Sequence, residues 1–220
     1  MLFPELRHKK FGYVNLNTEA KRWLEEAKIT TDQPNPLLDP DICYQMVHDL
    51  HKKEGLHFSY GGWLEDRRDL WRGSYLDHTG GYLHLGIDFN VPVGTGVAVD
   101  YEAEVLYVDN DFPAEGGWGN RVIMKYGHKP HIVIYAHLDD EIVCKEGDIL
   151  SPGDLFARVG ASPQNGGWFP HLHVQCVEQS YFDRVVRNDL ALLDGYGHMD
   201  DLDLLKQQFK DPFTMVTLSS

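Results

Sequence analysis

Apolar and polar residues alternate along the middle of the chain, from about residue 82 to residue 177. A period of two is the pattern of β-strands, because successive side chains of a strand point to opposite faces of a sheet. The alternating runs are residues 82–90, 95–101, 104–109, 120–126, 131–137, 154–160 and 171–177. The segment GHKP at residues 127–130 is typical of a hairpin turn between two of these runs. The pattern therefore predicts a central domain built mainly from β-strands.

Both ends of the chain follow a helical spacing instead, including about the first sixty residues. Between residues 19 and 28 apolar residues recur at intervals of three and four, and Thr18 can cap this helix. A second helix is expected to begin at Asp39 or Asp41 and to end near Lys53. Two further helical segments are expected at residues 184–193 and 200–209.

Three of the strand-like runs carry metal-ligating side chains on one face. The runs contain the strings HLGID, YAHL and PHLH. Strand alternation places the following residues on the polar faces: His84, Asp88, Tyr135, His137, His171 and His173. Four imidazoles and one carboxylate are the ligand chemistry of a catalytic zinc ion, with spare histidines for proton transfer. Each string alone is weak evidence, because 12 His and 34 acidic residues give such spacings by chance, and a polar strand face is the simpler explanation.

The conjunction of the three strings, in this order and context, is far more specific. The chain contains HLGIDFNVPVGTGV, then GNRVIMKYG and IVIYAHL, then EGDILSPGDLFARVG and PHLHVQ. Between about residues 83 and 177 it resembles the lysostaphin-like, or LytM-type, zinc endopeptidases, which cleave peptide bridges in bacterial cell walls. The resemblance implies a mainly β fold, an antiparallel barrel-sandwich hybrid with helical extensions at both ends. We expect a helical N-terminal extension at residues 1–80, the peptidase domain at 81–178 and a helical C-terminal extension at 179–220.

The resemblance also implies the role of each polar residue. His84, Asp88 and His173 would bind one Zn²⁺ per chain, and His137 and His171 would be catalytic. A catalytic zinc site needs three protein ligands and an open position for water, which agrees with this division. One of the two catalytic imidazoles would accept the proton of water, and the other would stabilise the oxyanion or protonate the leaving amine. The sequence leaves open which residue does which.

We therefore expect a zinc metalloendopeptidase that hydrolyses a peptide amide, in the stem or cross-bridge peptides of peptidoglycan. One alternative is an intracellular zinc hydrolase of the same fold that acts on a different substrate. A second is a non-catalytic relative that binds a partner through the same groove, although all five polar positions are intact. The chain departs from the family pattern at Gln175, where an acidic residue is common, and in the bulky string ASPQNGGWFP before His171.

The tripeptide Gly-Gly-Trp occurs three times, at residues 61–63, 116–118 and 166–168. The second and third copies precede strands that carry site histidines, and loops beside such strands tend to form the rim of a cleft. We expect Trp118, Trp168 and Tyr135 to contact the substrate. The alternative is that each Trp only anchors a Gly-rich loop to the core.

The amino-acid composition indicates which classes of binding partner and which cellular location to expect. A net charge of −14 argues against nucleic acid and against binding to anionic membranes, which both require clustered Lys and Arg. Three widely spaced cysteines without a C-x-x-C motif favour free thiols in a reducing compartment. The N-terminal residues lack the apolar run of a signal peptide, so a cytoplasmic location is expected. A trimmed leader or a non-classical export route would place the protein in the periplasm or outside the cell, and the oligomeric state is left open.

Overall fold

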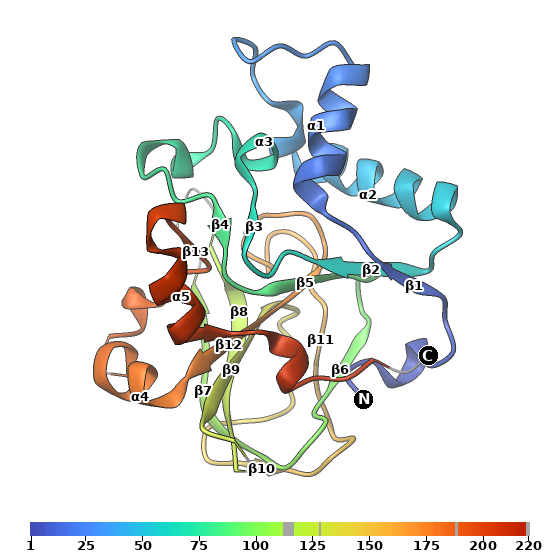
Figure 1. The fold of residues 1–220 in the computed structure, drawn as a ribbon. Helices are drawn as coiled ribbons and strands as arrows, with labels where there is room; N and C mark the ends of the chain where they lie inside the picture. Colours follow the sequence, from blue (N-terminus) through green and yellow to red (C-terminus); the bar gives the residue numbers. More distant parts are fainter. Residues whose placement is uncertain (112–116, 128, 188, 219–220) are drawn as a thin grey trace.

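The computed structural model describes residues 1–111, 117–127, 129–187 and 189–218 (Figure 1). In the described part of the chain, the largest sheet has nine strands in the order β1-β2-β5-β12-β9-β8-β7-β10, and β14 also pairs with β12. Its strands are β1 Phe11–Tyr13, β2 Phe58–Gly61, β5 Ile87–Asn90, β7 Ala103–Asp111, β8 Gly119–Tyr126, β9 His131–Leu138, β10 Ile149–Leu150, β12 Leu172–Glu178 and β14 Phe209–Lys210. Neighbouring strands are antiparallel except for the parallel pair β1–β2.

Two small sheets complete the β structure. One pairs β6 (Gly96–Ala98) with β11 (Leu155–Arg158), and the other has the order β13-β4-β3. The strands of the second are β3 Glu65–Asp66, β4 Leu83–His84 and β13 Tyr196–Gly197. The mainly β, mostly antiparallel architecture agrees with the sequence prediction. The hairpin between β8 and β9 is also confirmed, although its residue His128 lies outside the described residues.

The central strands of the large sheet are buried on both faces. Side chains of one face, such as Val122 and Val174, share a core with Phe156 of β11. Side chains of the other face, such as Ile134, share a second core with Phe182 and other residues of the C-terminal extension. The C-terminal extension is therefore one layer of the domain, and apolar residues on both faces of β8, β9 and β12 give these strands the near-continuous apolar character of buried strands.

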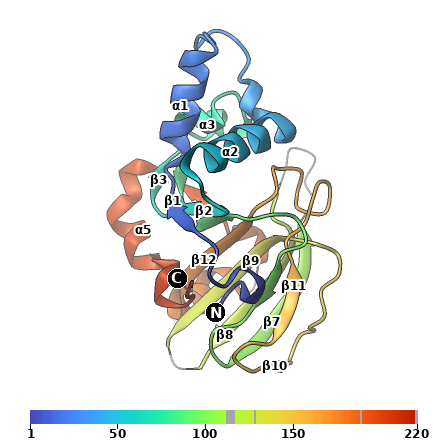
Figure 2. The ribbon, with the colours of Figure 1, turned by 90° about the vertical axis from the view of Figure 1, so that its right-hand side faces the viewer.

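The helical segments lie mostly toward the two ends of the chain, and Figure 2 shows α1 and α2 together beyond one edge of the sheet. The α-helices are α1 Leu16–Glu26, α2 Pro40–Glu54, α3 Arg68–Trp71, α4 Gln179–Tyr181 and α5 Leu202–Gln208. A π-helical turn covers Phe182–Val186, and 3₁₀ turns cover Pro4–Leu6, Pro36–Leu38, Tyr75–His78, Leu190–Leu192, Met199–Asp201 and Pro212–Thr214. None of the helices in the described ranges has the length and apolar character needed to cross a membrane.

The helix boundaries confirm part of the sequence prediction. Asp39 caps α2 through its side chain, as expected, and Gly55 ends the helix in the left-handed conformation. The predicted cap of α1 was wrong, because Asn15 accepts the N–H of Thr18 and the helix begins three residues earlier than predicted. The prediction that the first sixty residues are helical also misses β1 and β2. The helix predicted at residues 184–193 is divided into the π-helical turn and a 3₁₀ turn.

Candidate metal centre and catalytic cleft

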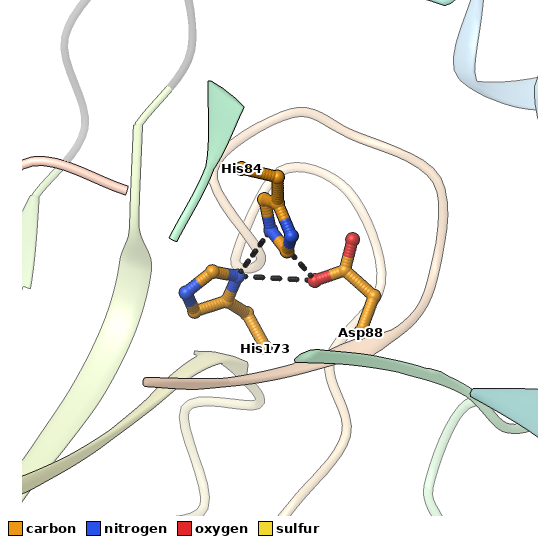
Figure 3. A group of neighbouring side chains, drawn as sticks. All are labelled: His84, Asp88 and His173. Atoms are coloured by element: carbon orange, nitrogen blue, oxygen red, sulfur yellow. Dashed lines mark hydrogen bonds and ion pairs between the residues drawn. The ribbon is translucent and has the colours of Figure 1, made fainter. Parts of the chain in front are cut away.

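Three side chains from three strands direct one ligand atom each toward a common point (Figure 3). His84 lies on β4, Asp88 on β5 and His173 on β12, where it is paired in register with Asp88. Nε2 of His84 is 3.0 Å from Nδ1 of His173, and Oδ1 of Asp88 is 3.3 Å and 3.0 Å from these two nitrogens. All three side chains are buried. The structure therefore brings together the three residues for which the sequence predicted metal binding.

Gly86 makes this convergence possible. It lies between the two ligands that flank the β4–β5 connection, and a Cβ added there would be 2.5 Å from Cε1 and Nε2 of His173. Real Cβ atoms do not approach other atoms so closely, so a side chain at this position would displace the imidazole. The glycine in HLGID is thus required by its packing against His173 of β12.

Hydrogen bonds on the outer side of the two imidazoles set their tautomers. Nδ1–H of His84 donates to the carbonyl of Gly62 at 2.9 Å, and Nε2–H of His173 donates to Oε1 of Gln175 at 3.1 Å. The amide of Gln175 is oriented in turn, because its Nε2 donates to the carbonyl of Asp194 at 3.0 Å. Both imidazoles therefore present an unprotonated nitrogen to Asp88, and three electron-pair donors face one another. A cation bound among these atoms would resolve this arrangement.

The protonation states suit a metal. Burial lowers the pKa of His84 to about 3, so its imidazole is neutral at pH 7. Burial alone would raise the pKa of Asp88, but His84, Arg67 and His171 hold it well below its usual value. Tetrahedral zinc with ligand distances near 2.0–2.1 Å separates its donor atoms by about 3.3 Å, close to the spacing seen here. The donor set of two imidazoles and one carboxylate fits a zinc ion.

His137 and His171 lie beside this centre, with their ring centroids 4.4 Å apart. Nδ1–H of His137 donates to the carbonyl of Asn165, and Nδ1–H of His171 donates to the carbonyl of Phe169, each at 2.7 Å. The Nε2 atoms are thus unprotonated, and that of His171 is 3.5 Å from Oδ1 of Asp88. Burial is the main cause that lowers the pKa of both imidazoles, and for His137 the pKa lies well below its usual value. Both side chains are therefore neutral at pH 7, each with an unprotonated Nε2.

The backbone of His137 explains its orientation and corrects one prediction. His137 has a φ of +64°, a left-handed conformation that is rare for residues other than glycine. The strand alternation is broken there, so His137 and Tyr135 do not share a face. Tyr135 is fully buried in the core, and its hydroxyl is hydrogen-bonded to that of Tyr126. The prediction that Tyr135 contacts the substrate is therefore wrong.

A cleft of about 670 Å³ opens onto the five polar residues. Its walls are rich in aromatic side chains, namely Trp71, Tyr75, Trp118, Trp168 and Tyr196. The ring of Trp118 contacts His173 edge-on at a centroid distance of 5.3 Å, and its Nε1–H donates to the carbonyl of Leu193 at 3.2 Å. The structure places Trp118 and Trp168 at the cleft, where the sequence predicted a substrate contact for each.

All three Gly-Gly-Trp segments reach this site, which the sequence did not reveal for the first. Gly62 supplies the carbonyl that orients His84, and Trp118 and Trp168 line the cleft. Gly116, in the second copy, lies outside the described residues. The recurrence of Gly-Gly-Trp was the signal that could have pointed to Gly62.

Both extensions take part in the site. Strand β4, which carries His84, is paired on one side with β3 of the N-terminal extension and on the other with β13 of the C-terminal extension. In register, Glu65 and Tyr196 are both partners of His84. Strand β4 is therefore held in place by one segment from each extension.

Residues 82–184 match the model of peptidase family M23, which confirms the resemblance inferred from the motifs. A zinc-containing peptidase from Vibrio cholerae is 28% identical with a TM-score of 0.37, over 44% of this chain and only 28% of that protein. The catalytic domain of the antimicrobial peptidase lysostaphin from Staphylococcus simulans is 20% identical with a TM-score of 0.40, over 60% of this chain and 78% of that domain. The catalytic domain of the prophage-encoded M23 protein EnpA from Enterococcus faecalis, in a mutant form, is 28% identical with a TM-score of 0.38, over 44% of this chain and 70% of that one. No curated protein matches the chain.

Proposed function

We propose that this chain, whose residues 82–184 match peptidase family M23, is a zinc-dependent endopeptidase that hydrolyses peptide amides of peptidoglycan. The observation that carries the proposal is the convergence of three unprotonated atoms that can bind a metal, one each from His84, Asp88 and His173. Two further neutral imidazoles lie beside them. Structural polar clusters satisfy their donors and acceptors internally. This cluster instead directs its acceptors at one point on the wall of a cleft.

The residues have complementary roles in the proposed hydrolysis. Zinc held by His84, Asp88 and His173 would lower the pKa of water and polarise the scissile carbonyl. Nε2 of one of the other two histidines, His137 or His171, accepts the proton of the attacking water. The other, once its own Nε2 has taken up this proton or one from solvent, donates a hydrogen bond to the developing oxyanion or a proton to the leaving amine. Their outer hydrogen bonds to backbone carbonyls hold both rings in place during these transfers.

Both the sequence motifs and the size of the cleft support the proposal that the substrate is a peptide of the bacterial wall. The resemblance of the motifs to lysostaphin-like peptidases implies stem or cross-bridge peptides of the bacterial wall. The cleft volume of about 670 Å³ admits a short stretch of peptide between its aromatic walls.

The direct test is to incubate the zinc-loaded protein with purified peptidoglycan and, separately, with a cytosolic peptide pool, and to identify the products by mass spectrometry. The His171→Ala variant is the matched control, because it should keep the metal ligands. Release of wall peptides by the wild type and not by the control supports the proposal. Cleavage of cytosolic peptides alone supports the intracellular zinc hydrolase. No cleavage of either by zinc-loaded protein supports the non-catalytic groove-binding relative.

A further inference from the structure

Arg67 belongs to the N-terminal extension, outside the segment that matches the family, yet it reaches the metal centre. It directly follows β3 and is 1% exposed. Its Nη1 donates to Oδ2 of Asp88 at 2.5 Å, and its Nε donates to Oε1 of Glu65 at 3.2 Å. The guanidinium also lies over the indole of Trp71, 5.4 Å from the ring centroid. A buried arginine thus contacts the single carboxylate of the proposed ligand set.

The contact divides the two oxygens of Asp88 between different partners. Oδ2 accepts from Arg67, whereas Oδ1 faces His84 and His173 at 3.3 Å and 3.0 Å. A carboxylate bound at one oxygen by a fixed donor cannot rotate freely about its terminal torsion. Asp88 therefore presents Oδ1 alone to the two imidazoles, as a ligand with one metal-binding oxygen requires.

The guanidinium is itself held rigidly. Oε1 of Glu65 accepts from Nε of Arg67 and also from the backbone N–H of Asn17, in the first turn of α1. A Cβ on Gly62 would be 2.2 Å from Nη2 of Arg67 and 2.6 Å from Nδ1 of His84, so this glycine lets the chain pass between the two side chains. Residues 62–67 therefore support two of the three ligands at once, through a carbonyl and through a guanidinium.

The charges around Arg67 also support a role for it at Asp88. The guanidinium lies between two carboxylates, those of Asp88 and Glu65, whose negative charges offset the cost of burying its positive charge. A buried arginine is retained in such a position only when its partners compensate for lost hydration. Without Arg67, Oδ2 of the buried Asp88 carboxylate would lose the guanidinium that donates to it.

We propose that Arg67 is a positioning residue of the metal centre, which fixes Asp88 with one oxygen toward the metal. This inference rests on the proposed zinc site and assigns part of that site to the N-terminal extension. The loss of a contact that orients a metal-binding carboxylate or imidazole typically lowers metal affinity or activity by about 10- to 100-fold. The expected effect is therefore on zinc affinity, which can be measured without any substrate.

The experiment measures the zinc dissociation constant of the full chain by competition with a chromophoric chelator, together with the melting temperature of the metal-free form. The variants are Glu65→Gln, which serves as the reference, and the double variant Glu65→Gln/Arg67→Met, which does not leave Glu65 unpaired. We expect the double variant to bind zinc about 10- to 100-fold more weakly than Glu65→Gln. Zinc affinity within threefold of the reference would overturn the proposal.

Arg121 offers a matched control. It is also buried, pairs with Asp109 through two hydrogen bonds of 2.7 Å and 2.9 Å, and lies 5.6 Å over the indole of Trp118, but it has no hydrogen bond to a proposed ligand. Arg121→Met should therefore keep the zinc affinity of the wild type, and an equal loss in Arg121→Met would overturn the proposal.

Arg67→Lys tests the role of the guanidinium if the double variant does not fold. Lysine keeps the charge but cannot hold Asp88 and Glu65 with a planar fork, so zinc should bind at least threefold more weakly than in the wild type. Wild-type affinity in Arg67→Lys would overturn the role of the guanidinium. Wild-type protein that binds no zinc would instead refute the proposed function, which keeps the two failures distinct.

Discussion

The imidazoles at the site follow one rule at the scale of single residues. Each donates its outward N–H to a carbonyl or amide oxygen, of Gly62, Asn165, Phe169 or Gln175, and presents the other nitrogen inward. The outer partner therefore selects the tautomer as well as the ring orientation. Three of the four partners are backbone carbonyls, which any residue can supply, so their positions leave no mark on the sequence.

The roles of His137 and His171 make a prediction that separates them from the ligands. His137→Ala and His171→Ala should retain zinc and fold but hydrolyse substrate about 10²–10⁴-fold more slowly, the usual scale of general acid–base catalysis. Zinc content and turnover should be measured on the same preparations. Loss of zinc by either folded variant would make that histidine a ligand, and wild-type turnover in both would remove them from the mechanism.

Trp168 makes a prediction about the cleft. Its indole lines the cleft and packs partly against the core formed by the N-terminal helices. Trp168→Ala should lower kcat/KM at least tenfold while the melting temperature falls by only a few degrees, because the side chain is partly exposed.

Trp23→Ala is the control for this change, since Trp23 packs against the same core but does not line the cleft. It should lower the melting temperature by a similar amount and leave kcat/KM unchanged. Equal effects of the two substitutions on kcat/KM would show that Trp168 acts only through stability.

The sequence predicted most of the polar site and little of its support. His84, Asp88, His137, His171 and His173 stand in recognisable strings, and the structure places all five together. Tyr135 was misplaced because a single left-handed residue, His137, reverses the strand alternation that the prediction assumed. Arg67 stands in no recognisable motif, and its partner Asp88 is 21 residues away, so no signal in the sequence indicated their contact.

At the scale of elements, the β4–β5 connection is the most constrained part of the site. Gly86→Ala should force the imidazole of His173 to move, with a loss of stability of about 1–3 kcal/mol, typical of overpacking, and a weakened metal site. Urea denaturation and zinc content would measure the two effects. Gly127→Ala is the control, because a Cβ there meets no atom within 4 Å. Full zinc and unchanged stability in Gly86→Ala would show that the connection is more adaptable than the structure indicates.

The strands were easier to predict than the helical extensions for a physical reason. Strands β7, β8, β9 and β12 are long and strongly alternating or apolar, so their pattern is visible in isolation. Strands β1, β2, β3 and β13 have two to four residues and are fixed by pairing with distant partners. Tertiary pairing of this kind overrides local propensity and cannot be read from a short segment.

At the scale of the whole molecule, the buried imidazoles predict how stability depends on pH in the metal-free form. His84 and His171 have pKa values lowered by burial, whereas in the unfolded chain a histidine titrates near 6.5. The unfolded state therefore binds more protons below pH 6.5, and stability falls as the pH decreases.

Between pH 7.5 and 5.5 His84 alone should cost the metal-free protein about 1 kcal/mol, and the lowered pKa values of His137 and His171 add to this loss. The pKa of Glu65, which burial raises, acts in the opposite direction as the pH falls. The urea midpoint of chelator-treated protein measures the balance. A midpoint that is constant or rises toward pH 5.5 would contradict the neutral, buried state of the imidazoles.

The central claim is that His84, Asp88 and His173 bind one zinc ion per chain, and elemental analysis of purified protein tests it most directly. The wild type should hold close to one zinc per chain, and His84→Ala, Asp88→Ala and His173→Ala should each lose it, whereas His137→Ala should keep it. Zinc at full occupancy in folded His173→Ala, or its absence from wild-type protein supplied with zinc, would contradict the account.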